Sequence, residues 1–269
     1  MLAGVDRDKF AVLRGARRVW AVGAIHGEAA RLTALHEQLG ERFLAGDRLV
    51  YLGNYIGHGR AVLETIDELL LFRRQLIAAP GMHVCDVAYL RGQQEEMWHK
   101  MLQLHLAVGP AEVLTWMLEQ GLRETLAAYG GDEKTALRRA RSGALELARW
   151  TNGLRQNMQA RDGHVELTSS LRRAALSDDG ALLFVHAGID AARPLDAQGD
   201  AFWWNSADFS ALEAPFAGYV RVVRGFDPEH GGVQVAPFST TIDSGCGFGG
   251  PLTSVCFGLD GEEVERIEV

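Results

Sequence analysis

Short apolar runs alternate with helical patterns in the first 90 residues of the chain. The runs at 18–22, 48–52 and 84–90, and a later one at 182–185, are rich in β-branched and aromatic residues, which favours strands. Residues 28–39 and 60–77 instead repeat their apolar positions at helical spacing. This alternation predicts an α/β protein with helices packed on the faces of a sheet.

The segment 97–176 has a helical pattern throughout. Trp98, Met101 and Leu102 fall on one face of its first helix, and we expect its tryptophans and methionines to pack in a core. Gly130-Gly131-Asp132 interrupts the pattern and is predicted to cap the next helix. We therefore expect one domain, 1–269, with a helical insertion at about 97–176.

Composition excludes several classes of protein. The chain has 269 residues, 47% of them hydrophobic, and a formal net charge of −8, which argues against a broad nucleic-acid-binding surface. No apolar run reaches the ~20 residues that span a bilayer, and residues 1–15 lack the apolar core of a signal peptide. These features predict a cytoplasmic protein that binds neither nucleic acid nor membrane.

Three cysteines are too few and too scattered for a disulfide framework or a zinc ribbon. Cys85 and Cys256 lie inside apolar strand patterns, so we expect both to be buried. Cys246 lies in a glycine-rich segment and is interpreted as a structural thiol.

Glycine-framed segments follow most of the strand-like runs. They read GAIHG at 23–27, GNYIGHG at 53–59, RGQQE at 91–95, VHAG at 185–188, GFD at 225–227 and IDSGCGFGG at 242–250. Loops at the carboxyl ends of strands meet at one edge of such a fold, so these segments are expected to converge.

In order and spacing, these segments resemble the calcineurin-like metallophosphoesterases, and most closely the branch of the phosphoprotein phosphatases and diadenosine tetraphosphate hydrolases. The resemblance spans residues 18–259. It implies a four-layer α-β-β-α sandwich of two mixed sheets, with the helical insertion roofing one side of the active-site groove. It also implies a site that holds two divalent cations.

Most of the residues that carry the chemistry in that family are replaced here. Ala24 and Asn54 stand at the positions of two metal-binding aspartates, Gln93 at that of a ligand asparagine, and Phe226 at that of the last ligand histidine. Only His26, Glu95 and His186 keep the residue that the resemblance implies, whereas the glycines of the frame are retained.

The catalytic positions are degenerate as well. Gln94 replaces the histidine that protonates the leaving group, and glutamine has no titratable proton near neutral pH. Gly57 and His58 replace an Asp-Arg pair, and Asn205 falls where relatives carry a second phosphate-binding arginine. Positioning and charge stabilisation of a phosphoryl group would therefore be lost together.

Charge determines what such a site can bind. Two cations ~3.5–4 Å apart need carboxylates to offset their repulsion, and the remaining side chains are neutral ligands that suit Mg or Mn poorly. We expect no two-metal centre and no cofactor. The leading hypothesis is a pseudophosphatase that binds a protein partner or a small phosphorylated ligand without hydrolysing it.

Two alternatives remain open. An active phosphoesterase could use a single Zn or Mn at a rebuilt site of His26, His58 and His186, with Asp227 as a further ligand. A ligand sensor could instead use the polar cavity left by the missing ions, which would be lined by His26, Asn54, His58, Arg91, Gln93, Gln94 and His186. Arg91 also has a purely structural alternative, which is pairing within the fold.

Overall fold

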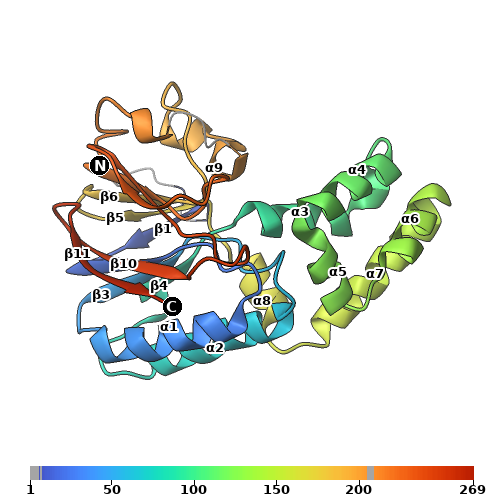
Figure 1. Ribbon diagram of the computed structural model, residues 1–269, viewed down its shortest axis with the longest axis horizontal. Helices are drawn as coiled ribbons and strands as arrows, with labels where there is room; N and C mark the ends of the chain where they lie inside the picture. Colours follow the sequence, from blue (N-terminus) through green and yellow to red (C-terminus); the bar gives the residue numbers. More distant parts are fainter. Residues whose placement is uncertain (1–5, 7, 205–208) are drawn as a thin grey trace.

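Two mixed β-sheets form the centre of the molecule in the computed structural model, which describes residues 6, 8–204 and 209–269 (Figure 1). Within these residues, one sheet has the order β1-β5-β6-β7-β9-β8 and the other the order β11-β10-β2-β3-β4. The strands of the first are β1 (Phe10–Leu13), β5 (Ala174–Ser177), β6 (Leu182–Val185), β7 (Arg221–Arg224), β8 (Gly232–Val235) and β9 (Ser239–Asp243). Those of the second are β2 (Arg18–Val22), β3 (Asp47–Tyr51), β4 (Val87–Tyr89), β10 (Thr253–Gly258) and β11 (Glu263–Glu268).

Parallel pairing at the centre of each sheet brings the motif loops together. β2, β3 and β4 are parallel neighbours in one sheet, and β6, β7 and β9 are parallel neighbours in the other. Each of the glycine-framed segments therefore leaves the carboxyl end of its strand at the same edge of its sheet.

Three apolar cores separate the layers. One lies between the sheets and includes Val50, Phe184 and Val255. A second packs the five-stranded sheet against α1 (Ala29–Arg42) and α2 (Val62–Ile77), which cover its outer face (Figure 1). The third covers the other sheet with α9 (Ala201–Trp204) and the short turns η4 (Leu195–Ala197) and η5 (Phe209–Ala211). The predicted four-layer sandwich is confirmed.

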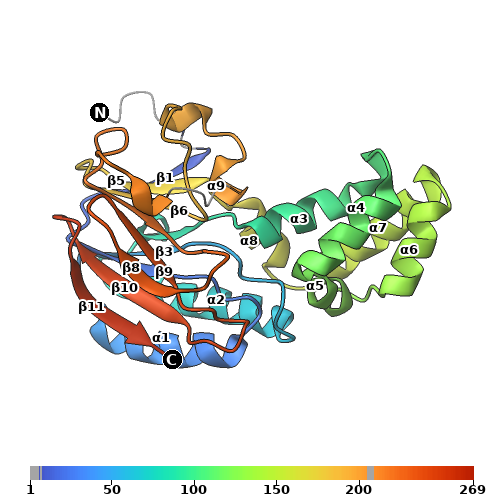
Figure 2. The same cartoon turned by 45° about the horizontal axis from the view of Figure 1, so that its top comes forward.

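The helical insertion extends to one side of the sandwich (Figures 1 and 2). Its helices are α3 (Gln93–Leu102), η2 (Leu104–Leu106), α4 (Pro110–Met117), η3 (Leu118–Leu122), α5 (Arg123–Ala128), α6 (Glu133–Arg141), α7 (Ala144–Gln159) and α8 (His164–Ser169). Asp132 caps α6 as predicted, since its carboxylate accepts the Thr135 N–H at 2.9 Å. The last helix of this segment ends at Ser169, and strand β5 begins at Ala174.

The run at 84–90 differs from its prediction at its start. Val84–Asp86 forms a 3₁₀ turn, η1, and the strand begins only at Val87. The Asp86 carboxylate accepts the backbone N–H of His83 at 2.8 Å, which stabilises the turn against extension. Cys85 lies on this turn and is exposed, so the prediction of a buried Cys85 was wrong, whereas Cys256 is buried. Among the helices of the described residues, none has the length and apolar character needed to cross a bilayer.

Candidate functional site

The loops after β2 and β3 place His26 and Asn54 side by side. Both residues have φ of 54°, a left-handed conformation that is uncommon outside glycine, and the His26 N–H donates to the Asn54 carbonyl at 2.7 Å. Gly53, with φ of 93°, lies so close to the next motif that a Cβ there would be 2.6 Å from the Gly92 nitrogen. The glycine frame thus holds the loops in an arrangement that other residues would not fit.

The buried carboxylate of Glu95 holds the glycine-framed loops together. Its carboxylate accepts the backbone N–H groups of Asn54 (2.9 Å), Tyr55 (2.8 Å), Ile56 (3.3 Å) and Gly92 (2.8 Å). Burial raises the pKa of Glu95, and these four backbone donors oppose that shift. The acidic residue that the sequence retains is therefore used to shape the 54–56 loop.

A cluster of histidine and phenylalanine rings occupies the edge where the motifs converge. Phe248 is 4.2 Å from His230, 4.4 Å from His58 and 5.3 Å from His26, as measured between ring centroids. Phe226 stacks on His186 at 5.4 Å and 11°. We call this set the histidine cluster; it comprises His26, His58, His186, His230, Phe226 and Phe248.

The two innermost histidines are neutral. Burial lowers the pKa of His186 to about 4, and that of His26 lies well below its ordinary value through burial first and the neighbouring histidines second. The Ile56 backbone opposes the pKa shift of His26, and Nδ1 of His26 has no hydrogen-bond partner among the described residues. His186 Nδ1 donates to the Leu52 carbonyl at 2.7 Å, which leaves Nε2 with a lone pair and no partner.

Apolar side chains fill the positions of two family metal ligands. Ala24, Ala187 and Phe226 form one buried apolar group. The remaining donors are neutral, and no three His, Cys, Asp or Glu side chains in the described part of the chain are grouped to hold a metal ion. These residues do not fit the two-cation centre that the resemblance implies, since Ala24 and Asn54 stand at the positions of its two metal-binding aspartates and supply no carboxylate to offset the charge of paired ions.

Asp227 does not join the histidines. Its carboxylate pairs with Arg224 at 2.7 Å, so the set His26, His58, His186 and Asp227 is not assembled as the single-metal hypothesis requires. The backbone N–H of Asp227 donates instead to Asp243, whose carboxylate also accepts His230 Nδ1 at 2.9 Å.

Sequence reasoning missed His230 and Phe248. Phe248 lies inside the IDSGCGFGG segment, and His230 follows three residues after Asp227. Their closeness to these motif segments in the sequence was the signal that could have placed them at the site. Their role depends on the buried Asp243, which orients the His230 ring through the hydrogen bond at 2.9 Å.

The insertion covers the site from one side. Gln94 Nε2 donates to the Gln120 carbonyl at 2.7 Å, and its backbone N–H donates to Asn54 Oδ1 at 3.0 Å. His58 packs against Gly121, which has φ of 99° and would place any Cβ inside the His58 ring. Gln94 and His58 therefore tie the roof to the sandwich.

The remaining predicted site residues are dispersed. Gln93 is half-buried at the start of α3. Arg91 pairs with Glu96 at 3.0 Å, which agrees with its structural alternative. Asn205 lies outside the described residues.

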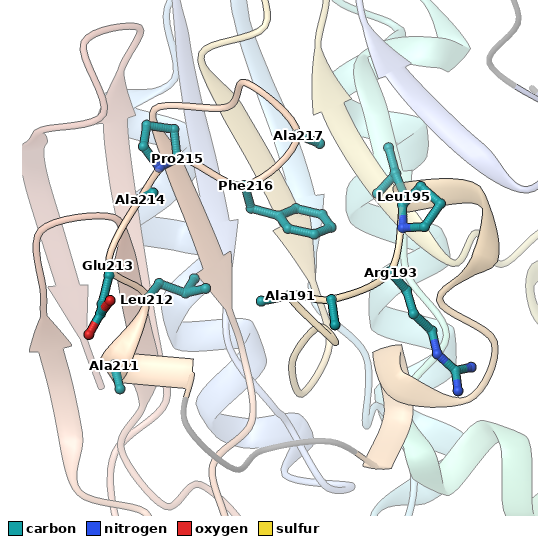
Figure 3. Close-up of a pocket in the computed structure, with 12 residues that line it drawn as sticks. Ala191, Arg193, Leu195, Ala211, Leu212, Glu213, Ala214, Pro215, Phe216 and Ala217 are labelled. Carbon is teal, nitrogen blue, oxygen red and sulfur yellow. The ribbon is translucent and has the colours of Figure 1, made fainter.

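A separate cavity of about 680 Å³ lies on the outer side of the six-stranded sheet (Figure 3). It is lined by residues 191–195 and 211–217, with Phe216, Pro215 and Leu195 among them. Because none of these belongs to a motif segment, this cavity is not the site that the sequence predicts.

Comparison with known proteins finds solved structures with a similar fold. No protein-family model and no curated protein matches the chain. A solved structure described as a "putative diadenosine tetraphosphatase" is 19% identical, with 97% of this chain and 97% of that chain covered and a TM-score of 0.58. A protein serine/threonine phosphatase from Saccharomyces cerevisiae with similarity to human phosphatase PP5 is 13% identical, with 97% and 82% covered and a TM-score of 0.53. The chain therefore has the fold of the calcineurin-like metallophosphoesterases.

Proposed function

We propose that this chain is a pseudophosphatase, which keeps the fold of these phosphatases and binds a protein partner or a phosphorylated ligand without hydrolysing it. The observation that carries the proposal is the stacking of Phe226 on His186 within a buried apolar group that includes Ala24. An aromatic ring and a methyl group stand where the resemblance implies a histidine and an aspartate. A phosphoryl group at this edge would therefore meet apolar side chains at these two positions in place of metal ligands.

The hydrogen bonds of Gln94 support the same conclusion. Its side-chain N–H₂ is used to hold the Gln120 carbonyl, and an amide has no proton to give to a leaving alkoxide. The phosphate-binding arginine next to it is also replaced, and His58 packs under Gly121 instead. Acid catalysis and phosphate clamping are thus both without a side chain to perform them.

Burial favours the protein partner over the phosphorylated ligand. Asn54, Gln94 and His186 are 0% exposed, so a ligand would reach them only after the roof moved. The surface, in contrast, carries Trp116 of α4 and Trp204 of α9, which are 45% and 38% exposed and lie 6.0 Å apart. Paired exposed tryptophans are typical of protein interfaces.

Hydrolysis assays test the proposal directly. We expect no turnover of p-nitrophenyl phosphate, its bis-ester or diadenosine tetraphosphate with Mg, Mn, Ni or Zn present, while an active phosphatase assayed in parallel turns over. Turnover of ~1 s⁻¹ or faster, in the ordinary range of enzymes, would overturn the proposal if His186→Ala abolished it.

One observation favours the second candidate, a single-metal phosphoesterase. His186 donates through Nδ1 to a backbone carbonyl and keeps Nε2 unpaired, which is the arrangement of many metal-ligating histidines. His58 or His230 would have to move toward it to complete a ligand set. Elemental analysis of the purified protein decides between the candidates, because one equivalent of Zn or Mn that His186→Ala removes would favour the second.

A further inference from the structure

A second cavity, of about 400 Å³, lies between α3, α7 and α8 of the insertion. Figure 2 shows α8 beside the start of α3, with the rest of the insertion beyond them. Buried apolar side chains line it, among them Trp98, Met158 and Leu171. Its volume is at the lower end of the range for small-ligand pockets.

Two guanidinium groups and one imidazole converge on this cavity. Arg91, His99 and Arg155 all line it. The pKa of His99 is lowered, first by burial and then by the charges of Arg91 and Arg155, which indicates that both guanidinium groups act on the same ring. A ligand that entered here would meet the same positive potential.

Arg155 is the cation without a counter-charge. Its bonds go to the neutral oxygens of Leu102 (2.5 Å) and Asn152 (2.7 Å), and it has no carboxylate partner within the described ranges. A guanidinium has five N–H donors, so Arg155 keeps several for a ligand. Arg91, in contrast, is neutralised by Glu96.

The acidic groups near the cavity are already engaged. Glu95 lines it, but its carboxylate accepts four backbone N–H groups of the motif loops. Glu96 pairs with Arg91 and with Lys100, at 3.0 and 3.4 Å. Among the residues that line the cavity, Arg91 and Arg155 are opposed by Glu95 alone, which leaves one positive charge and matches an anion of a single charge.

We propose that this cavity binds a small apolar monocarboxylate, with its carboxylate on Arg155 and its hydrocarbon part against Trp98, Met158 and Leu171. Charge-assisted bonds from a guanidinium are the strong class of hydrogen bond, and the buried apolar wall adds the hydrophobic contribution. Trp98 supplies a further donor, since its buried indole N–H has no partner in the described structure. The site is separate from the histidine cluster and does not depend on the proposed loss of hydrolysis.

Titration calorimetry with 4-phenylbutyrate and with its neutral analogue 4-phenylbutan-1-ol tests the proposal. We expect the carboxylate to bind the wild type more tightly than the alcohol, and Arg155→Met to weaken the carboxylate by about 10- to 100-fold with little effect on the alcohol. Arg149→Met is the matched control, because Arg149 lies on the same helix, is exposed and pairs with Glu146 outside the cavity.

A second variant, Ser169→Trp, tests the same cavity in case Arg155→Met fails to fold. Ser169 is an exposed residue that lines the cavity, so Ser169→Trp should block binding while the melting temperature stays unchanged. The proposal fails if no carboxylate binds the folded wild type at millimolar concentration. It also fails if the alcohol binds as tightly as the carboxylate, if phenylbutyl phosphate binds more tightly than either, or if Arg155→Met has no effect.

Discussion

At the residue scale, the candidate site is defined by the inner histidines His26 and His186, whose burial opposes their protonation. His186 is fully buried, and Phe226 stacks on its ring where a second metal ligand would stand in the resembling family. Protonation of His186 would place a charge in an apolar setting with no carboxylate in contact with it in the described residues. The cluster is consequently stable only while its inner histidines are neutral.

This neutrality predicts a loss of stability in mild acid. An unfolded histidine binds a proton below its ordinary pKa of 6.5, whereas His186 in the folded chain does so only near its pKa of about 4. Unfolding therefore takes up protons between these values, and stability falls as the pH drops through this window. Between pH 7 and pH 5, His186 alone should cost about 2 kcal/mol of unfolding free energy, as measured by urea titration.

His186→Asn provides the comparison. An asparagine amide keeps a donor for the Leu52 carbonyl but does not titrate, so the variant should lose less stability between pH 7 and pH 5 than the wild type does. His83→Asn, at an exposed position, should keep the full dependence. If the unfolding free energy of the wild type and of His186→Asn fell equally between pH 7 and pH 5, His186 would not be the source of the acid sensitivity.

At the element scale, the roof is held to the sandwich by an irregular turn. α4 runs into η3, which is kinked at Gly121, where φ is 99° and the backbone is not helical. The carbonyl of Gln120 accepts from Gln94, and Gly121 makes room for the His58 ring.

Gly121→Ala tests this contact. A Cβ at residue 121 would enter the His58 ring and would also strain a left-handed backbone, so we expect a loss of about 3 kcal/mol of unfolding free energy. Gly143→Ala is the matched control, since Gly143 has φ of 103° and a Cβ there meets no atom within 4 Å. It should cost about 1 kcal/mol from backbone strain alone. Equal losses in urea titrations would mean that His58 is not held against the roof.

The sequence predicted the elements better than the site. Alternating strand and helix patterns placed β2, β3, β6, α1 and α2 within a few residues, because their apolar periods match their burial. The start of β4 was mispredicted since one side chain, Asp86, bonds the backbone locally. The resemblance located the histidines, but it could not show that Phe226 stacks on His186 or that Asp227 turns to Arg224, because these depend on contacts between distant segments.

At the scale of the whole molecule, folding should be independent of divalent ions. A metal that bound the folded chain would stabilise it by mass action, and its removal would lower the melting temperature. The histidine cluster packs through contacts between its rings, and Ala24, Ala187 and Phe226 form a buried apolar group beside it. Melting curves recorded with and without EDTA should therefore overlay, and a drop of more than a few degrees on chelation would show that a bound ion contributes to folding.

The retained glycine frame leads to a further prediction about the whole fold, which is that a metal centre can be restored. Ala24→Asp, Asn54→Asp, Gln93→Asn and Phe226→His together return the family ligands to strand ends whose backbone still brings them together. The combination matters, because Ala24 and Phe226 are in contact and an aspartate at 24 alone would be a buried charge against a phenyl ring. Titration calorimetry with Mn should detect binding in the fourfold variant.

Phosphatase activity should need more substitutions than metal binding does, because positions 57, 58 and 94 are closely packed in the structure. Gly57 has φ of 123°, and a Cβ there would be 2.9 Å from the Gln94 side chain, so Gly57→Asp requires residue 94 to shift as well as a strained backbone. His58→Arg must in addition fit a longer side chain where the His58 ring now packs against Gly121. As a control, Asn54→Asp with Gln93→Asn keeps Phe226 in place and should bind no Mn. If the fourfold variant folds and still binds no ion, the strand ends do not hold the geometry that the resemblance implies, and these side chains alone cannot build a metal centre there.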